Sequence, residues 1–533
     1  MKCSWSIFLL LALLQQTFLC RADITMSSIF SNGAILQTTD DDGHAPVIFG
    51  TANSEATMII TVSGGKGNVF KQTFHADGQG QWNWYVSLPN TSSAKPGPYS
   101  IGIEEYTANG TIYIDSAGFG DVYFGDVYFC SGQSNMVYNV KGTTNAAEEL
   151  ARANYTNVRL FKAPGTRVSL LDNADTAGSS PWMPCNNETV ASFSAVCYLA
   201  AENIMKMHTK DRYIGLIESA VGGTGVQLWA TNKTDHTCGQ SSSQLSSNYK
   251  PASLYETMIL PYLPYTVRAA IWYQGEANAD ECCPIGRSDY TCYLEHMMRD
   301  WRAVWGYDVP FVVIQLHTWG YLPCDAETPV ISQPQAGIRL AEWDVWRQNS
   351  NDTFLVTAAD QGGSLHPPYK SEVARRVALA LIANVFKQNV TWLGPSIVNG
   401  TANHTTSTNG KRQFEVDLIL KNGEGLKLVK TRACNGTKPD TCTRYCCNNG
   451  APGLFILEGY DWSSTYSAHM YNLAVTSVAD NRLHLSMLTN DTYDGKAHLA
   501  RLLYAVGSQP TCSVVNGDGI AMATQGPIYL ALR

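Results

Sequence analysis

The sequence is poor in charge, lacks basic runs and has no apolar run long enough to cross a membrane. Charged residues make up 15% of the 533 residues, and the formal net charge of −8 is spread along the chain. Without a basic patch the chain lacks the electrostatic signature of nucleic-acid binding, so we expect no nucleic-acid partner. The apolar run at residues 7–14 is well short of the roughly 20 residues that a spanning helix needs, so we expect no membrane anchor.

The first 22 residues predict a secretory signal peptide. Lys2 precedes the apolar run, and the small residues Cys20 and Ala22 come just before Asp23. This order of charge, apolar core and small residues is typical of a cleaved export signal. A membrane anchor is the alternative interpretation, and the short core argues against it.

Glycosylation sequons are dense, which also indicates export. They begin at Asn90, Asn109, Asn154, Asn187, Asn232, Asn351, Asn389, Asn399, Asn403, Asn435 and Asn490. A single sequon is often unused, but this density predicts a heavily glycosylated surface.

The cysteines predict disulfides rather than a metal site. Thirteen remain after the signal peptide, and eight of them form two clusters, at residues 282–324 and 434–447. In an oxidising compartment such clusters predict disulfides, although the pairing cannot be deduced. The chain has no CxxC pair and no HExxH motif, so we expect no zinc and no catalytic metal.

Three regions follow the signal peptide. Residues 23–120 contain short alternating runs separated by Gly-rich turns, which predict an antiparallel β domain that serves as a scaffold or contacts carbohydrate. Residues 121–389 alternate apolar strands with amphipathic helices, which predicts a parallel sheet covered on both faces. Residues 390–533 return to strand-like alternation with NG, DN and DG turns.

The predicted strands of the middle region end in polar stretches. The strands are expected at residues 122–130, 213–220, 269–276, 310–317 and 353–361, and the helices at 195–208, 293–306 and 372–386. In open parallel sheets, ligands bind beyond the carboxyl ends of the strands. We therefore searched these ends for chemistry.

Ser134 follows the first of these strands within the sequence CSGQSNM. A serine on a turn at the end of a strand is exposed to a cleft, as a nucleophile requires. The alternative is a serine that caps the next helix. Cys130, four residues earlier, is a second candidate nucleophile, although a thiol within a strand is expected to behave as a buried apolar group.

A serine hydroxyl needs a base, and His366 is the candidate. It stands in DQGGSLHPPYK, directly after the strand at 353–361 and before a helix. Pro367 and Pro368 lead into that helix, which restricts the loop. His366 is therefore expected at the same edge of the sheet as Ser134.

Acyl transfer also needs donors for the oxyanion. Gly222 and Gly223 in ESAVGGTGVQLW offer backbone N–H groups with no side chain in the way. Gln274 in WYQGEAN offers a side-chain amide after another strand, and Asn278 is a less favoured substitute. Each motif alone is equally compatible with a tight turn or a buried polar residue.

Taken in order, CSGQSNM, GGTGVQLW, WYQGEAN and LHPPYK resemble the SGNH-type hydrolases and, within them, the sialate O-acetylesterases. The ending YAVGSQP…NGDGIAM is similar to that family as well. The resemblance implies a flavodoxin-like three-layer α/β/α domain with β-rich accessory regions, no cofactor, and a lysosomal or secreted location. It implies a serine esterase that removes O-acetyl groups, the 9-O-acetyl group favoured, from sialic acids or sialoglycans.

By position, Ser134 matches the family's nucleophile and His366 its base, with Gly222, Gly223 and Gln274 as oxyanion donors. The sequence departs from the family's pattern at the acid of the catalytic triad. Gly363 stands three residues before the histidine, where related enzymes have aspartate. Asp360 is the nearest carboxylate, Glu276 is the other candidate, and a dyad is the third possibility. The alternative functions are an esterase for other acetylated glycans such as xylan, or a glycan-binding protein without catalysis.

Overall fold

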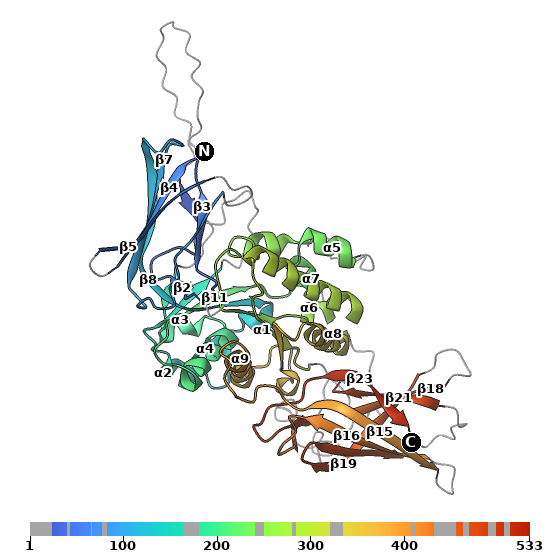
Figure 1. Cartoon of the computed structure of the whole chain (residues 1–533). Coiled ribbons are helices and arrows are strands. Elements are labelled where there is room, and N and C mark those ends of the chain that lie inside the picture. Colours follow the sequence, from blue (N-terminus) through green and yellow to red (C-terminus); the bar gives the residue numbers. More distant parts are fainter. Residues whose placement is uncertain are drawn as a thin grey trace.

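The chain consists of three regions arranged in a row in a computed structural model, which Figure 1 shows from the N-terminal strands to the C-terminal strands. The structure describes residues 24–39, 43–64, 67–76, 83–163, 181–239, 250–279, 284–319, 334–406, 412–430, 455–461, 468–488, 497–505 and 512–532. The predicted signal peptide lies outside these residues. The expected mixture of helices and strands is confirmed.

The N-terminal region is built from short antiparallel strands. One sheet has the order β1-β3-β6, and a second group pairs β4 with β5 and β7. The bounds are β1 Thr25–Met26, β2 Ile35–Gln37, β3 Val47–Thr51, β4 Thr57–Gly64, β5 Gly67–His75, β6 Trp84–Ser87 and β7 Tyr99–Tyr106. The buried apolar side chains of this region form one continuous cluster with those of the middle region. The two regions therefore share a core.

Strand β8 (Tyr113–Gly132) connects the first two regions without a break. Its first half pairs with β7, and its second half pairs with strands of the middle region. Asp121 has a positive φ of 55°, next to a register shift in the β7 pairing. Such irregularities bend a strand and redirect it. The predicted boundary at residue 120 thus falls inside a strand rather than in a linker.

The middle region is a largely parallel sheet with the order β10-β9-β11-β8-β12-β13-β14, in which only β10 pairs antiparallel among the described strands. The bounds are β9 Val158–Lys162, β10 Met183–Pro184, β11 Ile214–Ala220, β12 Ala269–Tyr273, β13 Phe311–Gln315 and β14 Thr353–Thr357. Every residue of the last four strands is buried. Continuous burial is expected where helices cover a parallel sheet.

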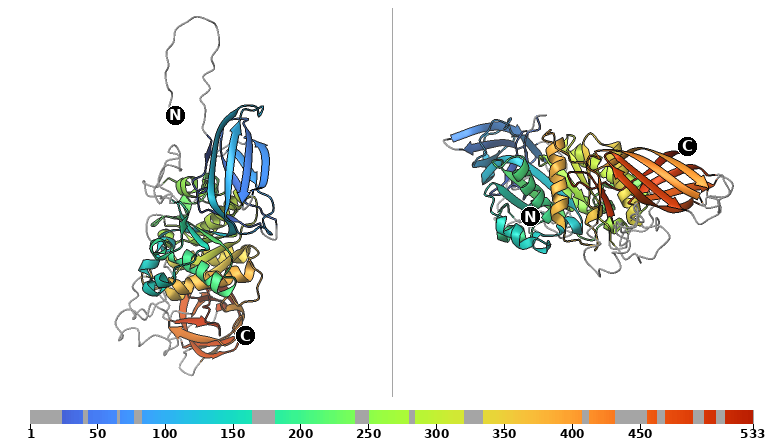
Figure 2. Two further views of the ribbon diagram at one scale, coloured as in Figure 1. Left: turned by 90° about the vertical axis from the view of Figure 1, so that its left-hand side faces the viewer. Right: turned by 90° about the horizontal axis from the view of Figure 1, so that it is seen from below.

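The helices of the middle region form two groups. Helix α4 packs against α9, and α7 packs against α8, while α8 and α9 both contact β13. Figure 2 shows the same region from two other directions. The helix bounds are α1 Ser134–Val137, α2 Ala146–Arg152, α3 Asn187–Ala191, α4 Ala195–Met207, α5 Asn232–Cys238, α6 Glu276–Ala279, α7 Arg287–Trp305, α8 Pro334–Gln348 and α9 Lys370–Asn384.

Short helical turns complete the middle region, namely η1 Val140–Gly142, η2 Val226–Leu228, η4 Tyr255–Ile259 and η5 Ala359–Gln361. In the part of the chain that the structure describes, no helix is both long and apolar enough to span a bilayer.

The C-terminal region is a sheet that closes on itself in the order β15-β16-β20-β19-β18-β21-β23, with β17 and β22 forming a separate pair. The bounds are β15 Ser396–Thr406, β16 Arg412–Lys421, β17 Lys427–Lys430, β18 Phe455–Asp461, β19 Ala468–Ala479, β20 Arg482–Leu488, β21 Ala497–Tyr504, β22 Cys512–Val515 and β23 Gln525–Leu532. Val416, Leu418 and Leu420 are buried at alternate positions of β16, as a half-buried strand requires. This region has its own apolar core.

Two disulfides lie in the described residues. Cys130 on β8 bonds Cys197 on α4, and Cys238 on α5 bonds Cys292 on α7. The expectation of a free thiol at Cys130 was wrong, although the residue is buried in its strand as expected. Cys292 pairs outside the cluster in which the sequence grouped it, because α5 and α7 pack together. The other clustered cysteines lie outside the described residues.

The sequon asparagines are exposed wherever the structure describes them. Asn435 and Asn490 lie outside the described residues. Exposure is the condition that glycosylation requires.

Candidate active site

Ser134 begins the short helix α1 directly beyond the carboxyl end of β8, which lies between β11 and β12 in the sheet. The turn needs glycine at position 132: its φ is +137°, and a Cβ there would lie 2.1 Å from the carbonyl oxygen of Tyr273. Such a φ favours glycine. Ser134 is half-buried, and its Oγ lies 3.4 Å from Gln133 Nε2. The hydroxyl is therefore at the sheet edge where the sequence analysis expects it.

Gly222 lies beside Ser134 and is exposed. A Cβ on Gly222 would stand 3.4 Å from Ser134 Cβ and 4.0 Å from the Ser134 nitrogen. A methyl group at this position would therefore be in van der Waals contact with the serine. Gly223 follows with a φ of +70°, so the backbone turns sharply at this point. The loop after β11 thus brings Gly222 to the serine, and the chain turns at Gly223 directly after it.

Gln274 is fully buried, and its amide is already engaged within the fold. Its Nε2 donates to Thr224 O at 2.9 Å and to Asn278 Oδ1 at 2.8 Å, and lies 3.2 Å from Gln133 Oε1. An amide has two hydrogens, and these partners use both. Gln274 therefore cross-links the loops around Ser134, and it could donate to an oxyanion only by giving up one of these bonds.

Asn278 is engaged in the same way. Its Oδ1 accepts from Gln274 and from Val226 N, while its Nδ2 donates to Gln227 Oε1 at 2.8 Å. The two side-chain amides that the sequence offers as oxyanion donors thus bond mainly to each other and to nearby loops.

His366 is exposed in the loop between η5 and α9. The residue before it, Leu365, places its carbonyl oxygen 2.9 Å from Asn135 Nδ2. Asn135 in turn is the residue after Ser134. The loop of the expected base and the turn of the expected nucleophile are consequently joined by a hydrogen bond between their neighbours.

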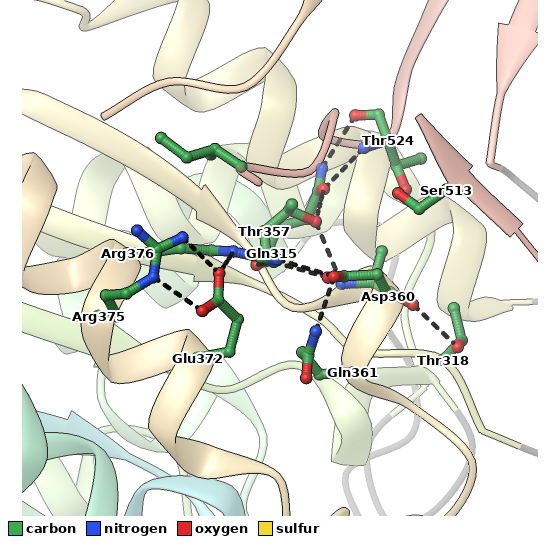
Figure 3. Close-up of polar contacts among 12 residues, drawn as sticks. Gln315, Thr318, Thr357, Asp360, Gln361, Glu372, Arg375, Arg376, Ser513 and Thr524 are labelled. Carbon is green, nitrogen blue, oxygen red and sulfur yellow. Dashed lines mark hydrogen bonds and ion pairs between the residues drawn. The ribbon is translucent and has the colours of Figure 1, made fainter. Parts of the chain in front are cut away.

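Asp360 is buried and paired with Arg376 on α9 (Figure 3). Arg376 Nη1 donates to Oδ1 at 2.6 Å and Nη2 donates to Oδ2 at 2.7 Å, and Gln361 Nε2 also donates to Oδ2. Burial alone would raise the pKa of Asp360, but the charge and bonds of Arg376 lower it. The carboxylate that the sequence offers to His366 is thus already neutralised by an arginine.

Glu276, the other candidate for the acid, is the first residue of α6. Its Oε1 accepts from Asn135 Nδ2 at 2.6 Å and lies 3.6 Å from His317 Nδ1. Both Glu276 and His317 are buried. Glu276 therefore contacts the residue beside Ser134 and a second histidine that lies just after β13.

Lys370 completes this buried group at the start of α9. Its Nζ donates to Asn135 Oδ1 and lies 4.9 Å from the ring centroid of Tyr138 and 5.4 Å from that of Tyr273. Burial lowers the pKa of Lys370 to about 7, although the charge of Glu276 opposes the shift. A lysine pKa near 7 is uncommon, and strongly shifted pKa values are concentrated at functional sites.

Sequence reasoning did not identify Asn135, His317 and Lys370 as parts of this group. Each stands in a motif or at a strand end described above: Asn135 in CSGQSNM, Lys370 in LHPPYK, and His317 at the end of the expected strand at 310–317. Polar residues that directly follow strand ends were the available signal.

Within the described residues, one group of potential metal ligands lies close enough together to hold an ion, namely Cys238, Cys292 and His296. The two cysteines form a disulfide, so they offer no thiolate to a metal. Cys130 is likewise oxidised, and it cannot be a nucleophile while its disulfide is intact.

Residues 124–358 match the family model described as carbohydrate esterase, sialic acid-specific acetylesterase. The expected family resemblance is confirmed. This span includes Ser134, Gly222 and Gln274 and ends just before Asp360. The match identifies the chain as a carboxylic ester hydrolase.

Curated relatives agree with the family model. The chain is 28% identical over 432 residues to the sialate O-acetylesterase of Mus musculus, which covers 69% of this chain and 75% of the relative. It is 26% identical over 401 residues to the sialate O-acetylesterase of Homo sapiens, which covers 69% and 72%. A solved carbohydrate acetylesterase from Xanthomonas citri has a TM-score of 0.67 at 22% identity and covers 94% of this chain and 98% of its own. That structure supports the fold over nearly the whole chain.

Proposed function

We propose that this chain is a serine esterase that removes O-acetyl groups from sialic acids, with the 9-O-acetyl group favoured, through an acetyl-enzyme. Ser134 Oγ attacks the acetyl carbonyl while His366 takes its proton. His366 then returns this proton to the sugar oxygen as the C–O bond breaks. Water, activated by His366, attacks the acetyl-enzyme and releases acetate.

The observation that carries the proposal is the hydrogen bond between Asn135 and Leu365, the neighbours of Ser134 and His366. It brings two segments that are 230 positions apart in the sequence to one edge of the sheet. The family match and the sialate O-acetylesterase relatives support the substrate class.

In this proposal the oxyanion is bound by backbone N–H groups of Ser134 and of Gly222 or Gly223. The closeness of Gly222 to Ser134 supports that role. Gln274 supports the loops that present these donors, and it serves as a third donor only if it exchanges a bond. Asp360 orients the His366 loop, but its pairing with Arg376 makes it a weak partner for an imidazolium.

We further propose that residues 121–389 form a three-layer SGNH-type domain, with residues 23–120 and 390–533 as β-rich accessory regions. The two helical groups around the parallel sheet support this division. Disulfides and exposed sequons support a secretory-pathway protein that is secreted or lysosomal.

The decisive experiment compares acetate release by the wild-type protein and by Ser134→Ala. We expect the substitution to lower kcat on O-acetylated sialic acid by about 10⁴-fold to 10⁶-fold, because no other group replaces the nucleophile. Folding should be unchanged, since the turn depends on Gly132 rather than on the hydroxyl. Near-normal turnover by Ser134→Ala would disprove the mechanism.

Two further arms separate the alternatives. Acetylated xylan tested beside O-acetylated sialic acid distinguishes a general glycan esterase from a sialate esterase. A glycan-binding protein without catalysis would release no acetate from either. Activity is expected to survive chelators and to be lost with organophosphates, which label activated serines.

A further inference from the structure

The carbonyl oxygen of Leu365 is held from two sides. It accepts from Asn135 Nδ2 at 2.9 Å and lies 3.0 Å from His317 Nε2. Leu365 immediately precedes His366, Asn135 immediately follows Ser134, and His317 lies two residues beyond β13. One backbone atom thus links the loop of the base, the turn of the nucleophile and a third strand end.

The environment of His317 dictates where its proton lies. A carbonyl can only accept, so Nε2 must carry the hydrogen that binds Leu365. Burial, aided by the nearby charge of Lys370, lowers the pKa of His317 well below its usual value, so the ring is neutral and Nδ1 has a lone pair. Tyr273 OH lies 3.0 Å from Nδ1. Burial raises the pKa of Tyr273, so its hydroxyl keeps its proton and donates to Nδ1.

The environment of Asn135 fixes its amide in the same way. The carbonyl of Leu365 can only accept, so Asn135 must turn its nitrogen toward Leu365 and its oxygen toward Lys370 Nζ, which donates to it. The nitrogen then faces two acceptors, Glu276 Oε1 and Leu365 O. If the amide were flipped, its nitrogen would face Lys370 Nζ and its oxygen would face the oxygens of Glu276 and Leu365. Asn135 and His317 are therefore each held in one orientation by a buried neighbour.

We propose that Asn135 and His317 are positioning residues for the esterase reaction, and that they set His366 relative to Ser134 by holding the carbonyl of Leu365. Tyr273 and Lys370 act one step further away by orienting these two side chains. This inference rests on the proposed roles of Ser134 and His366. Because the positioning residues do not touch the substrate, their loss lowers kcat and leaves KM nearly constant.

Tyr273→Phe is the sharpest test, because it removes one hydroxyl and keeps the ring. Without that donor, the proton of His317 can move to Nδ1, which lies 3.6 Å from Glu276 Oε1. His317 then no longer donates to Leu365. We expect kcat to fall by about tenfold to 100-fold, as for small misplacements of catalytic groups, with KM changed by less than about threefold.

Tyr265→Phe is the matched control. Tyr265 is equally buried, and its hydroxyl donates to Ile35 O at 2.6 Å at the junction with the N-terminal region. It should lose a similar amount of stability without any change in kcat. Equal kcat values for the two variants, or a change confined to KM, would overturn the inference.

A second pair of variants covers the case in which a phenylalanine perturbs packing. His317→Ala should lower kcat, and His317→Gln, whose amide can donate toward Leu365, should recover part of the loss. If both variants at matched folded fraction turned over alike, the inference would be wrong.

The rate at which an organophosphate labels Ser134 separates this inference from the proposed function. If the wild-type protein is labelled fast and Tyr273→Phe is labelled slowly, the result supports the positioning role, whichever acetyl ester is the substrate. Fast labelling of both refutes it and leaves the esterase assignment intact. Wild-type protein that is neither labelled nor active refutes the proposed function itself, and the positioning role with it.

Discussion

Asp360 and Glu276 are two buried carboxylates, and their partners differ completely. Asp360 faces an arginine that bonds both of its oxygens. Glu276 faces an asparagine, a neutral histidine and a lysine whose pKa is lowered to about 7. One carboxylate sits in a closed ion pair, and the other sits beside a lysine whose charge changes near neutral pH.

This difference indicates that the Asp360–Arg376 pair stabilises the fold, whereas the residues around Glu276 support the reaction. The Asp360 pair leads away from Ser134: Arg376 also donates to Thr357 O, and Thr357 donates to Gln315 (Figure 3). The Glu276 group leads toward Ser134 through Asn135. Proximity of a carboxylate to His366 in sequence is therefore a poor guide to its function.

The largest expected effect is on stability, from Asp360→Asn. Removing one member of a buried ion pair leaves the other uncompensated and typically costs about 3–5 kcal/mol in the free energy of unfolding. Urea unfolding would measure the loss. At matched folded fraction we expect kcat to fall by less than about tenfold, because Arg376 already neutralises Asp360.

The pH dependence of the same pair has a defined sign. The pKa of Asp360 is lowered in the folded protein, so its contribution to stability is present above its unfolded pKa and is lost as the pH falls through the folded value. Asp360→Asn should remove this loss at acid pH. A fall of about 10⁴ in kcat with stability intact would instead identify Asp360 as the acid of a triad.

Glu276→Gln is expected to affect kcat more than Asp360→Asn does and stability less. The amide keeps an oxygen for Asn135 but removes a negative charge beside Lys370 and His317, so the orientation of Asn135 is disturbed. We expect kcat to fall by about tenfold, which corresponds to ~1.4 kcal/mol of activation free energy. The loss of unfolding free energy should be smaller than for Asp360→Asn. If Glu276→Gln were more active than Asp360→Asn, or equally destabilised, the two carboxylates would not differ as proposed.

A change of slope in stability against pH is expected at Lys370. Its folded pKa of about 7 is below the ordinary value of 10.5. Between these values the unfolded chain holds one more proton at this site, so stability rises with pH, by at most about 1.4 kcal/mol per pH unit. Lys370→Met should flatten the curve above pH 7. The surface substitution Lys387→Met is a control, and an equal effect there would contradict the assignment.

Much of the middle region could be predicted because its strands are continuously apolar. The expected strands correspond to β8, β11, β12, β13 and β14, and three expected helices correspond to α4, α7 and α9, although β8 and α7 begin earlier than expected, at Tyr113 and Arg287. The strand order could not be predicted, since β9 is short and pairs beyond β11. The sequence also could not show that β8 passes through both regions, because a bulge at Asp121 resembles a turn.

At the candidate active site, the sequence motifs predicted where the residues lie but not which side chains they bond to. Ser134 and Gly222 are neighbours as expected, because both follow adjacent parallel strands. Asp360 pairs with Arg376 on α9, and Gln274 bonds to Tyr290 on α7, each 16 residues further along the chain. Such side-chain pairing between a loop and a helix leaves no periodic pattern in the sequence.

The bonds of Gln315 have a consequence for the order in which the protein can finish folding. Its side chain is buried in the middle region, yet it donates to Thr524 O and accepts from Thr524 N, which lies 209 residues later. At about 5–20 residues per second, the ribosome needs roughly 10–40 s to reach Thr524 after Gln315. During that interval the amide must bind water or another group. The hydrogen bonds of this buried amide are therefore completed only when the last strands of the chain arrive, so shortening the chain before Thr524 should leave a nascent domain that binds chaperones for longer.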